Sequence, residues 1–555
     1  MGEMAVQLSG AEILAEIIGT WKRNPVFHVP GEGMLEILDA LTARCPAVRL
    51  ISCRHEGGMA FMADATARFG DEPGLCLVGR APGALNTTLA LHTAHTDSVP
   101  LIMLIGQAPM AHAEREAFLG CDDFQRTFAA MAKWVAVVPD AGRLPEFMSR
   151  AFHVALSGRR GPVVLVVPQE VLQQTAVVDL PARPPAPLRV APSAADLERL
   201  QQLLQAAERP LLIAGGSGWD AQAVVDLATF ARYQGLPMVA AYRRRDLVDN
   251  ESPLYAGELG IGMDPALARR VAVADLLLVV GMRLGELNTI GSAAFHGFSL
   301  IDAPTPQQVL VHVHADTAEL NRVYRAGLAI NATPPEMARA LSGLSPQVPD
   351  GRWQTWCRSA REDRLTFVAG GSCPGPVDLK AVFRELRGRL RDDAILTSGA
   401  GGYALWPQRY VSHRRFGTQV APKSGAMGYG LAAAIGLKLC NPDRRVVAIA
   451  GDGCLLMHGE ELATAVLYRV PIIVLVINNQ AYGAIRLSQQ RLFGRVTGVD
   501  LRSPDFSAYA RAFGAHGERV LATADFAPAL ERAMAVEGPA LIELVTSPDV
   551  VKPVA

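Results

Sequence analysis

Short runs of consecutive apolar residues recur along the chain and alternate with stretches of helical periodicity. Runs of this length, bounded by turn residues, are typical of strands that are buried on both faces of a parallel sheet. Because such strands are joined by helices that cover the sheet, the pattern predicts doubly wound α/β domains. The runs form three groups, at residues 75–79, 100–106 and 162–168, then 210–216, 275–281 and 309–315, then 394–399, 446–453, 472–479 and 540–545.

Two proline-rich interruptions divide the chain. Residues 179–193 cannot continue a helix or a central strand and are predicted to form an extended linker. A weaker break spans residues 344–378. The predicted architecture is therefore three doubly wound, Rossmann-like domains, at residues 1–178, 194–343 and 376–555. A chain of 555 residues, half of them apolar, is long enough for three separate cores.

Composition excludes several classes of function. The formal net charge of −1 indicates no surface for nucleic acid or for an anionic membrane. No apolar run is long enough to span a bilayer. Residues 1–20 resemble a first amphipathic helix and not a signal peptide. The eight cysteines lack metal-ligand spacing, which predicts reduced thiols and a cytoplasmic location.

The motif with the clearest chemistry joins two neighbouring apolar runs. The first run ends at Gly451-Asp452-Gly453, and the second ends at Asn478-Asn479. If both are adjacent parallel strands, their carboxyl ends lie about 4.8 Å apart. A carboxylate and an amide oxygen then converge on one hard cation, and Mg²⁺ prefers such ligands and shares them with phosphates. The glycines allow backbone N–H groups to approach a phosphate closely.

This arrangement resembles the diphosphate-anchoring motif of thiamine diphosphate enzymes. The resemblance implies that Asp452, Asn479 and the main-chain carbonyl of Ala481 bind Mg²⁺. Glu56, at the start of a predicted helix, resembles the catalytic glutamate that hydrogen-bonds N1′ of the cofactor's aminopyrimidine. Met427 resembles the apolar residue that props the cofactor into its bent shape.

Further cofactor contacts follow from the same resemblance. Residues 398–406 resemble a loop that cradles phosphates through backbone N–H groups, with Tyr403-Ala404 where acetohydroxyacid synthases usually carry His-Gln. The other residues predicted to bind the cofactor are Gly401, Gly402, Tyr403, Gly425, Gly451, Gly453, Cys454, Tyr482 and Gly483.

The resemblance extends over nearly the whole chain and is closest to the acetohydroxyacid (acetolactate) synthase-like branch. In that family the site is assembled between chains, which implies a homodimer or homotetramer with sites at the subunit interface. The segments that carry the resemblance are residues 27–33, 79–86, 96–107, 158–170, 275–286 and 308–322.

The predicted substrate residues depart from the synthase pattern. Leu119 follows Phe118 where synthases carry glutamine, and Glu32 replaces a small residue beside Gly31. These departures weaken acetolactate as the specific product and leave a pyruvate-like 2-oxo acid or a hydroxyketone as donor. The residues predicted to line the substrate site are Gly31, Glu32, Gln107, Phe118, Leu119 and Arg486.

The roles of the two charged residues in this set stay open. An ionised Glu32 would repel an anionic acceptor and favour an aldehyde or hydroxyketone, whereas a protonated Glu32 would donate a hydrogen bond. Alternatively, Glu32 pairs with a basic group and only holds its loop. Arg486 is either a solvated helix cation or a carboxylate-binding group.

The sequence therefore predicts a thiamine diphosphate- and Mg²⁺-dependent lyase or carboligase. The alternatives are an FAD-containing enzyme of the pyruvate oxidase type, acetolactate synthase proper and a non-catalytic paralogue, the last disfavoured because Glu56, Asp452 and Asn479 are all present. The glycine turn in residues 211–221 could face a nucleotide phosphate, but residues 281–289 depart from the synthases' pattern, so no tightly bound FAD is expected. The donor, the acceptor, the oligomeric state and the pathway stay open.

Overall fold

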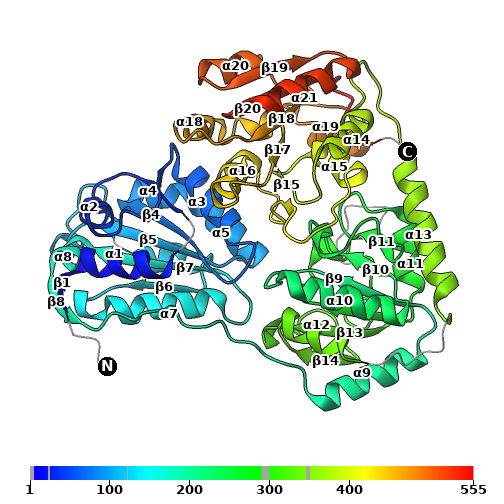
Figure 1. The fold of residues 1–555 in the computed structure, drawn as a ribbon, viewed down its shortest axis with the longest axis horizontal. Coiled ribbons are helices and arrows are strands. Elements are labelled where there is room, and N and C mark those ends of the chain that lie inside the picture. The colour runs from blue at the N-terminus through cyan, green and yellow to red at the C-terminus, as the bar shows by residue number, and fades with distance from the viewer. Residues whose placement is uncertain (1–5, 23–24, 122, 291–298, 345–350, 554–555) are drawn as a thin grey trace.

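The computed structural model describes residues 6–22, 25–121, 123–290, 299–344 and 351–553. It contains three sheets of six parallel strands each, every one covered by helices (Figure 1). The predicted fold class of three doubly wound α/β domains is confirmed. Among the described residues, no helix is long and apolar enough to cross a membrane.

The first sheet has the strand order β3-β2-β4-β5-β7-β6. A short antiparallel pair, β1 (Val6–Ser9) with β8 (Thr175–Val178), lies beside it. The strands of the six-stranded sheet are β2 (Val26–Val29), β3 (Leu50–Ser52), β4 (Gly74–Gly79), β5 (Leu101–Gln107), β6 (Trp134–Val137) and β7 (Pro162–Pro168). Its helices are α1 (Gly10–Trp21), α2 (Leu35–Arg44), α3 (Glu56–Thr66), α4 (Arg80–Asn86), α5 (Thr88–Asp97), α6 (Phe124–Phe128), α7 (Leu144–Leu156) and α8 (Gln169–Gln173).

The middle sheet has the order β11-β10-β9-β12-β13-β14. Its strands are β9 (Pro210–Ala214), β10 (Met238–Ala240), β11 (Tyr255–Glu258), β12 (Leu276–Val280), β13 (Val309–His314) and β14 (Leu328–Asn331). Its helices are α9 (Ala194–Ala206), α10 (Ala221–Gln234), α11 (Pro265–Val273) and α12 (Pro334–Ser342).

The third sheet has the order β16-β15-β17-β18-β20-β19. Its strands are β15 (Ile395–Ser398), β16 (Gln419–Val420), β17 (Val446–Gly451), β18 (Ile473–Asn478), β19 (His516–Val520) and β20 (Ala540–Val545). Its helices are α14 (Leu379–Arg389), α15 (Leu405–Tyr410), α16 (Tyr429–Cys440), α17 (Asp452–Leu455), α18 (Leu462–Leu467), α19 (Gly483–Phe493), α20 (Phe506–Ala512) and α21 (Phe526–Ala535).

The two proline-rich breaks differ in structure. Residues 179–193 contain no helix or strand. The second break contains a helix that the sequence analysis missed, α13 (Gln354–Ala369). Trp353, just before it, is buried and donates a hydrogen bond from its indole N–H to the carbonyl of Ala207, at 3.1 Å. The predicted domain limits themselves stay predictions, although each sheet lies within one predicted range.

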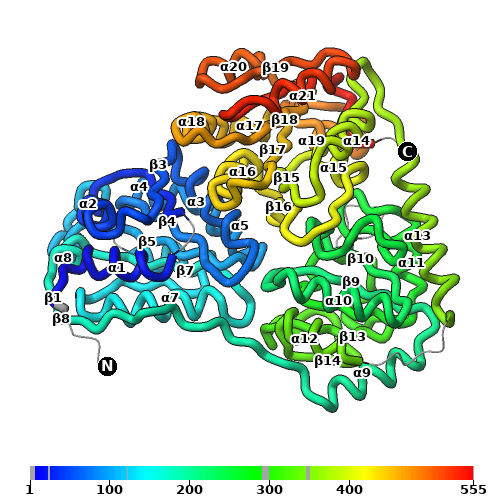
Figure 2. The backbone as a smooth tube through the Cα atoms, viewed as in Figure 1, coloured from blue at the N-terminus to red at the C-terminus, as the bar shows by residue number. Residues whose placement is uncertain are grey.

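The first and third domains meet where α3 packs against α16, as Figure 2 also shows. Asp64 on α3 is completely buried and accepts a hydrogen bond from the Tyr429 hydroxyl, at 2.6 Å. Arg68 forms ion pairs with Asp64 at 2.8 Å and with Asp97 at 2.9 Å. Burial raises the pKa of Asp64 against these favourable contacts. The buried Asp64 carboxylate therefore joins the two domains, and the hydrogen bond from Tyr429 and the ion pair with Arg68 offset the cost of burying it.

Replacing Tyr429 with Phe removes one hydrogen bond from this buried carboxylate. We expect the variant to lose about 1–2 kcal/mol and its melting temperature to fall by about 2–4 °C. Calorimetry of the purified protein measures the shift. Tyr233→Phe is the matched control, because Tyr233 is 57% exposed. An equal melting temperature for Tyr429→Phe and the control would contradict the assignment.

Candidate cofactor and substrate site

The GDG and NN motifs lie at one edge of the third sheet. β17 and β18 are neighbouring parallel strands, and their register pairs Gly451 with Ile477. Asp452 and Asn478 therefore follow the last pair on adjacent strands. The premise that these carboxyl ends lie side by side is correct.

The two asparagines have different hydrogen-bond partners. Asn478 donates to the Glu543 carboxylate at 2.7 Å and accepts from the Gln480 N–H at 3.2 Å, so its side chain is committed to the sheet. The Asn479 oxygen accepts only a long hydrogen bond of 3.3 Å, from the Ala481 N–H. Among the described contacts, Asn479 thus has the more available oxygen, as a metal ligand requires.

Asp452 is suited to a cation. Its side chain is 2% exposed, and burial raises its pKa, opposed by a hydrogen bond of 2.7 Å from the Ser503 hydroxyl. No arginine, lysine or histidine of the described residues forms an ion pair with it. A buried carboxylate without a cationic partner is costly unless a cation binds it. Ser503 lies far along the chain in an irregular segment, and no sequence pattern points to it.

Tyr403 and Cys454 form the inner wall of the proposed phosphate cradle. A side chain added at Gly451 or at Gly401 would lie 2.7 Å from the Tyr403 ring. The Tyr403 hydroxyl donates to the Cys454 sulfur at 3.1 Å, and the Gly428 N–H donates to the same sulfur at 3.2 Å. Gly451 is therefore required by close packing, and the Cys454 thiol holds two segments of the cradle together.

Other predicted glycines pack tightly at the same edge. A side chain at Gly453 would lie 2.7 Å from the Tyr482 ring, and one at Gly483 would lie 2.8 Å from the Asn479 amide. A side chain at Gly402 would meet Val551 at 2.6 Å. These glycines are thus required by close packing of the turns.

Met427 and Gly425 come from the segment before α16. Met427 is half-buried and packs against the core of the third domain. Gly425 is exposed and has a φ of 80°, a left-handed conformation that favours glycine. The placement of both residues beside a cofactor stays a prediction.

Glu56 is the first residue of α3, and its half-buried carboxylate lies against α4. One carboxylate oxygen accepts a hydrogen bond of 2.9 Å from the Asn86 amide. A side chain added at Gly83 would lie 2.9 Å from the other oxygen. The sequence analysis used residues 79–86 only as a family signature, and the structure shows that Gly83 and Asn86 position the predicted catalytic carboxylate.

Among the described residues, no hydrogen bond or ion pair joins Glu56 to the third domain of its own chain. That domain instead binds the backbone just before it. The Glu461 carboxylate accepts hydrogen bonds from the N–H groups of Arg54 at 3.2 Å and His55 at 2.9 Å. The structure thus brings Asp452 and Asn479 to one edge, but it does not bring Glu56 into contact with them.

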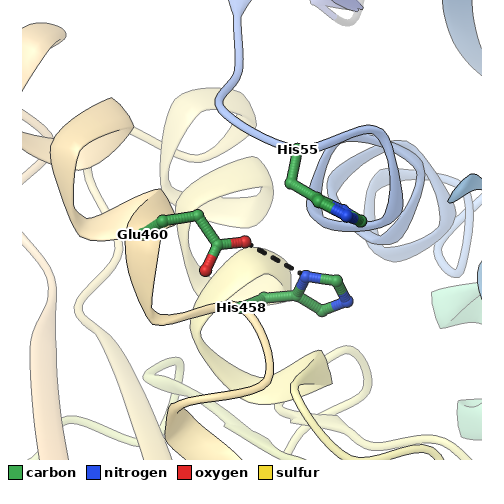
Figure 3. Close-up of side chains that lie close together, drawn as sticks. All are labelled: His55, His458 and Glu460. Carbon is green, nitrogen blue, oxygen red and sulfur yellow. Dashed lines mark hydrogen bonds and ion pairs between the residues drawn. The ribbon is translucent and has the colours of Figure 1, made fainter. Parts of the chain in front are cut away.

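His55, His458 and Glu460 lie together where the first and third domains meet, and their ligand atoms are within 4.8 Å of one another (Figure 3). However, His55 Nδ1 already accepts the Gly57 N–H at 3.0 Å as the cap of α3. A metal on its other nitrogen would require the ring to lose both protons, whereas metal-binding histidines donate from the second nitrogen. The trio therefore fits a hydrogen-bonded cluster, in which His458 contacts Glu460 at 3.3 Å, better than a metal centre.

The predicted substrate residues of the first domain gather at the carboxyl ends of β2, β4 and β5. Glu32 forms an ion pair with Arg80 at 3.3 Å. Arg80 also donates to the Phe118 carbonyl at 2.9 Å, and the Ala81 N–H donates to the Leu119 carbonyl at 2.9 Å. Of the roles left open for Glu32, the structure thus shows the pairing with a basic group.

The remaining predicted substrate residues surround this group or lie apart from it. Gly31 packs against Gly79, and Gln107 donates a long hydrogen bond of 3.5 Å to the Cys121 carbonyl. Arg486 lies on α19 and pairs with Asp500 at 3.2 Å, while Asp549 is 3.9 Å away. Arg486 therefore already has acidic partners at the surface.

A cleft lies between the first and middle domains, and Lys423 of the third domain also lines it. It opens at the carboxyl ends of β9, β12 and β13, the edge where nucleotides bind in open α/β sheets. Gly216, of the predicted phosphate-facing turn, lines it and lies so close to the Gly281 carbonyl that a side chain has no room. Its basic lining residues are Arg159, Arg160, Arg189, Arg283, His314 and Lys423.

Sequence models of one family match three parts of the chain. The thiamine pyrophosphate enzyme N-terminal TPP binding domain matches residues 8–126, the central domain matches residues 197–341, and the C-terminal TPP binding domain matches residues 399–544. The chain belongs to the thiamine pyrophosphate enzymes. The family resemblance that the motifs predicted is thereby confirmed, and the site at the edge of β17 and β18 falls within the C-terminal TPP binding domain.

Relatives among the thiamine pyrophosphate enzymes cover nearly the whole chain. The chain is 30% identical to acetolactate synthase isozyme 2 large subunit of Escherichia coli, over 97% of this chain and 95% of the relative. It is 30% identical to the acetolactate synthase large subunit of Parasynechococcus marenigrum, over 94% of this chain and 86% of the relative. These similarities support an acetolactate synthase-like enzyme of the thiamine diphosphate-dependent type.

Substituting Gly451 with Ala tests the cradle. The added carbon would lie 2.7 Å from Tyr403, so the ring or the turn must shift. We expect thiamine diphosphate affinity to fall at least tenfold, measured by isothermal titration. Gly388→Ala is the control, because nothing lies within 4 Å of its added carbon; in α14 that change should stabilise by about 0.5–1 kcal/mol. Unchanged affinity in Gly451→Ala would show that the turn does not bind the cofactor.

Proposed function

We propose that the protein is a thiamine diphosphate- and Mg²⁺-dependent lyase or carboligase that acts on a pyruvate-like 2-oxo acid or a hydroxyketone. The observation that carries this proposal is the pair of oxygen ligands, Asp452 and Asn479, at the adjoining ends of β17 and β18. The acetolactate synthases among the relatives support carboligation. The departures at Glu32 and Leu119 leave acetolactate synthase proper as the alternative.

The residues present fit the two groups. Asp452, Asn479 and the Ala481 carbonyl would hold Mg²⁺, and the turns around Gly451 and Gly401 would receive the diphosphate. Bound thiamine diphosphate supplies a carbon nucleophile that stabilises negative charge next to a carbonyl. The chain's own contribution is Glu56, which would hold a proton at N1′ of the aminopyrimidine while Asn86 fixes its carboxylate.

With pyruvate as donor, the atoms balance as follows. The bond between C1 and C2 of the donor breaks and CO₂ leaves. A new bond forms between C2 of the donor and the carbonyl carbon of the acceptor, and the acceptor's carbonyl oxygen takes a proton. Small-molecule 2-oxo acids and aldehydes are thus the proposed partners, and the proposed location is the cytoplasm.

We further propose a homodimer or homotetramer in which Glu56 of one chain meets the cofactor of another. Two observations support an interface. Glu56 has no described contact with its own GDG turn, and α19 beside that turn has no buried residue although it exposes Ile485, Leu492 and Phe493. Exposed apolar patches of this kind mark protein interfaces.

The middle domain is proposed to work without a tightly bound FAD. The cleft at the carboxyl ends of β9, β12 and β13 is the specific observation behind the second candidate, a flavin-dependent oxidase. Its arginines are already ion-paired with Asp71, Asp220 and Glu319. A visible spectrum of the purified protein decides between them, since flavin gives a characteristic absorption band. A stoichiometric flavin band would establish the second candidate.

A product screen tests the activity itself. Protein loaded with thiamine diphosphate and Mg²⁺ is incubated with pyruvate or acetoin as donor and with a panel of 2-oxo acids and aldehydes as acceptors. Mass spectrometry should detect at least one carboligation product or CO₂ release above the Glu56→Gln control. Turnover that needs no cofactor would contradict the proposal.

Glu56→Gln is expected to slow turnover by at least a hundredfold, because the amide keeps the shape but cannot supply the acidic proton. Its oxygen can still accept from Asn86, so the fold should be unaffected. Hydrogen–deuterium exchange at C2 of the bound cofactor, followed by NMR, measures the step directly. Exchange at the wild-type rate would remove Glu56 from its role.

Asp452→Ala should abolish Mg²⁺-dependent retention of the cofactor, because the ion links the diphosphate to the protein. Isothermal titration with thiamine diphosphate, with and without Mg²⁺, measures this dependence. Ser503→Ala is the matched control, since it removes only the hydrogen bond to Asp452. If Asp452→Ala binds the cofactor as tightly as this control, the metal assignment is wrong.

A further inference from the structure

In the part of the first domain that the structure describes, Arg80 is the one cationic side chain that forms a hydrogen bond or ion pair with a predicted substrate residue. It is not among the residues predicted from the sequence. It begins α4 directly after β4. Its guanidinium reaches Glu32 at 3.3 Å and the Phe118 carbonyl at 2.9 Å, so it contacts two of the three segments predicted to line the substrate site.

The same short helix connects Arg80 to the predicted catalytic carboxylate. Arg80 and Gly83 are three residues apart in this helix. Gly83 lies against the Glu56 carboxylate, and Asn86 donates to it. The same helix thus carries Arg80 and the two residues that lie against the Glu56 carboxylate.

The backbone of Arg80 adopts an unfavourable conformation. Its φ of 32° lies in a region that side-chain-bearing residues rarely adopt. Leu119, which faces it, has a φ of 56°. Backbone strain of this kind concentrates at functional sites, so the guanidinium is placed there at a conformational cost.

The guanidinium also retains unused donor capacity. Its contacts with Glu32 and Phe118 both use Nη1, while its Nε is buried and has no hydrogen-bond partner among the described residues. The Arg80 side chain is 13% exposed, whereas that of Glu32 is 58% exposed. Nη2 makes no hydrogen bond or ion pair among the described contacts, and a guanidinium is shaped to bind a carboxylate through two parallel hydrogen bonds.

We propose that Arg80 is a specificity-determining residue that binds the carboxylate of an incoming 2-oxo acid, and that Glu32 is an exchangeable counter-ion that occupies Arg80 until this anion arrives. The inference rests on the proposed function and deepens it. It reverses the effect expected for an unpaired Glu32, because the paired site attracts an anionic acceptor instead of repelling it.

The first test is a competition inside one reaction. Holoenzyme receives pyruvate as donor with equal concentrations of pyruvate and acetaldehyde as acceptors, and mass spectrometry measures the ratio of acetolactate to acetoin. This ratio cancels changes in cofactor loading and in the donor step. Arg80→Gln should lower the ratio by about 10- to 100-fold. Arg80→Lys keeps the positive charge but loses the paired, planar N–H donors, so it should lower the ratio less.

Glu32→Gln distinguishes substrate binding from a structural role. If Glu32 competes with the substrate, its neutralisation should raise the ratio severalfold, opposite in sign to Arg80→Gln. If the ion pair only holds the loop, both variants should change the ratio in the same direction. A ratio unchanged in Arg80→Gln, or moved in the same direction by both variants, overturns the proposal.

A binding experiment separates this proposal from the proposed function. In the Glu56→Gln background, in which turnover is expected to be at least a hundredfold slower, pyruvate and its neutral analogue pyruvamide are titrated into the holoenzyme. Adding Arg80→Gln should lower the affinity for pyruvate at least tenfold and the affinity for pyruvamide much less. If the affinity for pyruvate falls more than that for pyruvamide but the wild-type protein makes no product, the proposed carboligase function is contradicted and the role of Arg80 is not. Equal losses for both ligands, or no pyruvate binding before the substitution, would overturn the role of Arg80.

Discussion

The candidate site depends on where the parallel strands end. In the third sheet, the register of β17 against β18 places Asp452 beside the asparagines. In the first sheet, Arg80 follows β4 and Gln107 ends β5. Because side chains alternate between the faces of a strand, a register shift of one residue would turn these groups away. The apolar strands therefore do more than build cores, since their pairing sets the geometry of the polar groups beyond them.

Glycines allow the turns at this edge to pack closely. A side chain at Gly106 would lie 2.1 Å from the Gly33 carbonyl, so two turns of the first domain touch through backbone alone. In the third domain the Tyr403 ring occupies the space that a side chain at Gly451 would need. In both places a side chain would force neighbouring segments apart, so these glycines set the shape of the edge. The cost is low tolerance to substitution at these few positions.

The sequence could predict the sheets and the GDG–NN edge because both are local patterns that repeat a known geometry. It could not predict contacts between distant polar residues. Glu32 and Arg80 are far apart in sequence, and the pairing of β2 with β4 in one sheet brings their loops together. Ser503 reaches Asp452 from an irregular segment. The helix α13 was missed because its polar composition lies between proline-rich stretches and its packing depends on tertiary contacts.

The position of Glu56 is set by two domains at once. Its carboxylate is fixed by α4 of the first domain, while the backbone before it is held by Glu461 of the third. Glu461 is completely buried and also accepts a hydrogen bond from Thr464 at 2.6 Å. Burial raises its pKa, and these hydrogen bonds offset that cost. Loss of the Glu461 anchor would leave a buried carboxylate without these partners, so the third domain helps to hold the backbone that precedes Glu56. A cofactor held by another chain would therefore bind a Glu56 carboxylate that is already oriented. Its binding would not include the entropy cost of ordering that side chain.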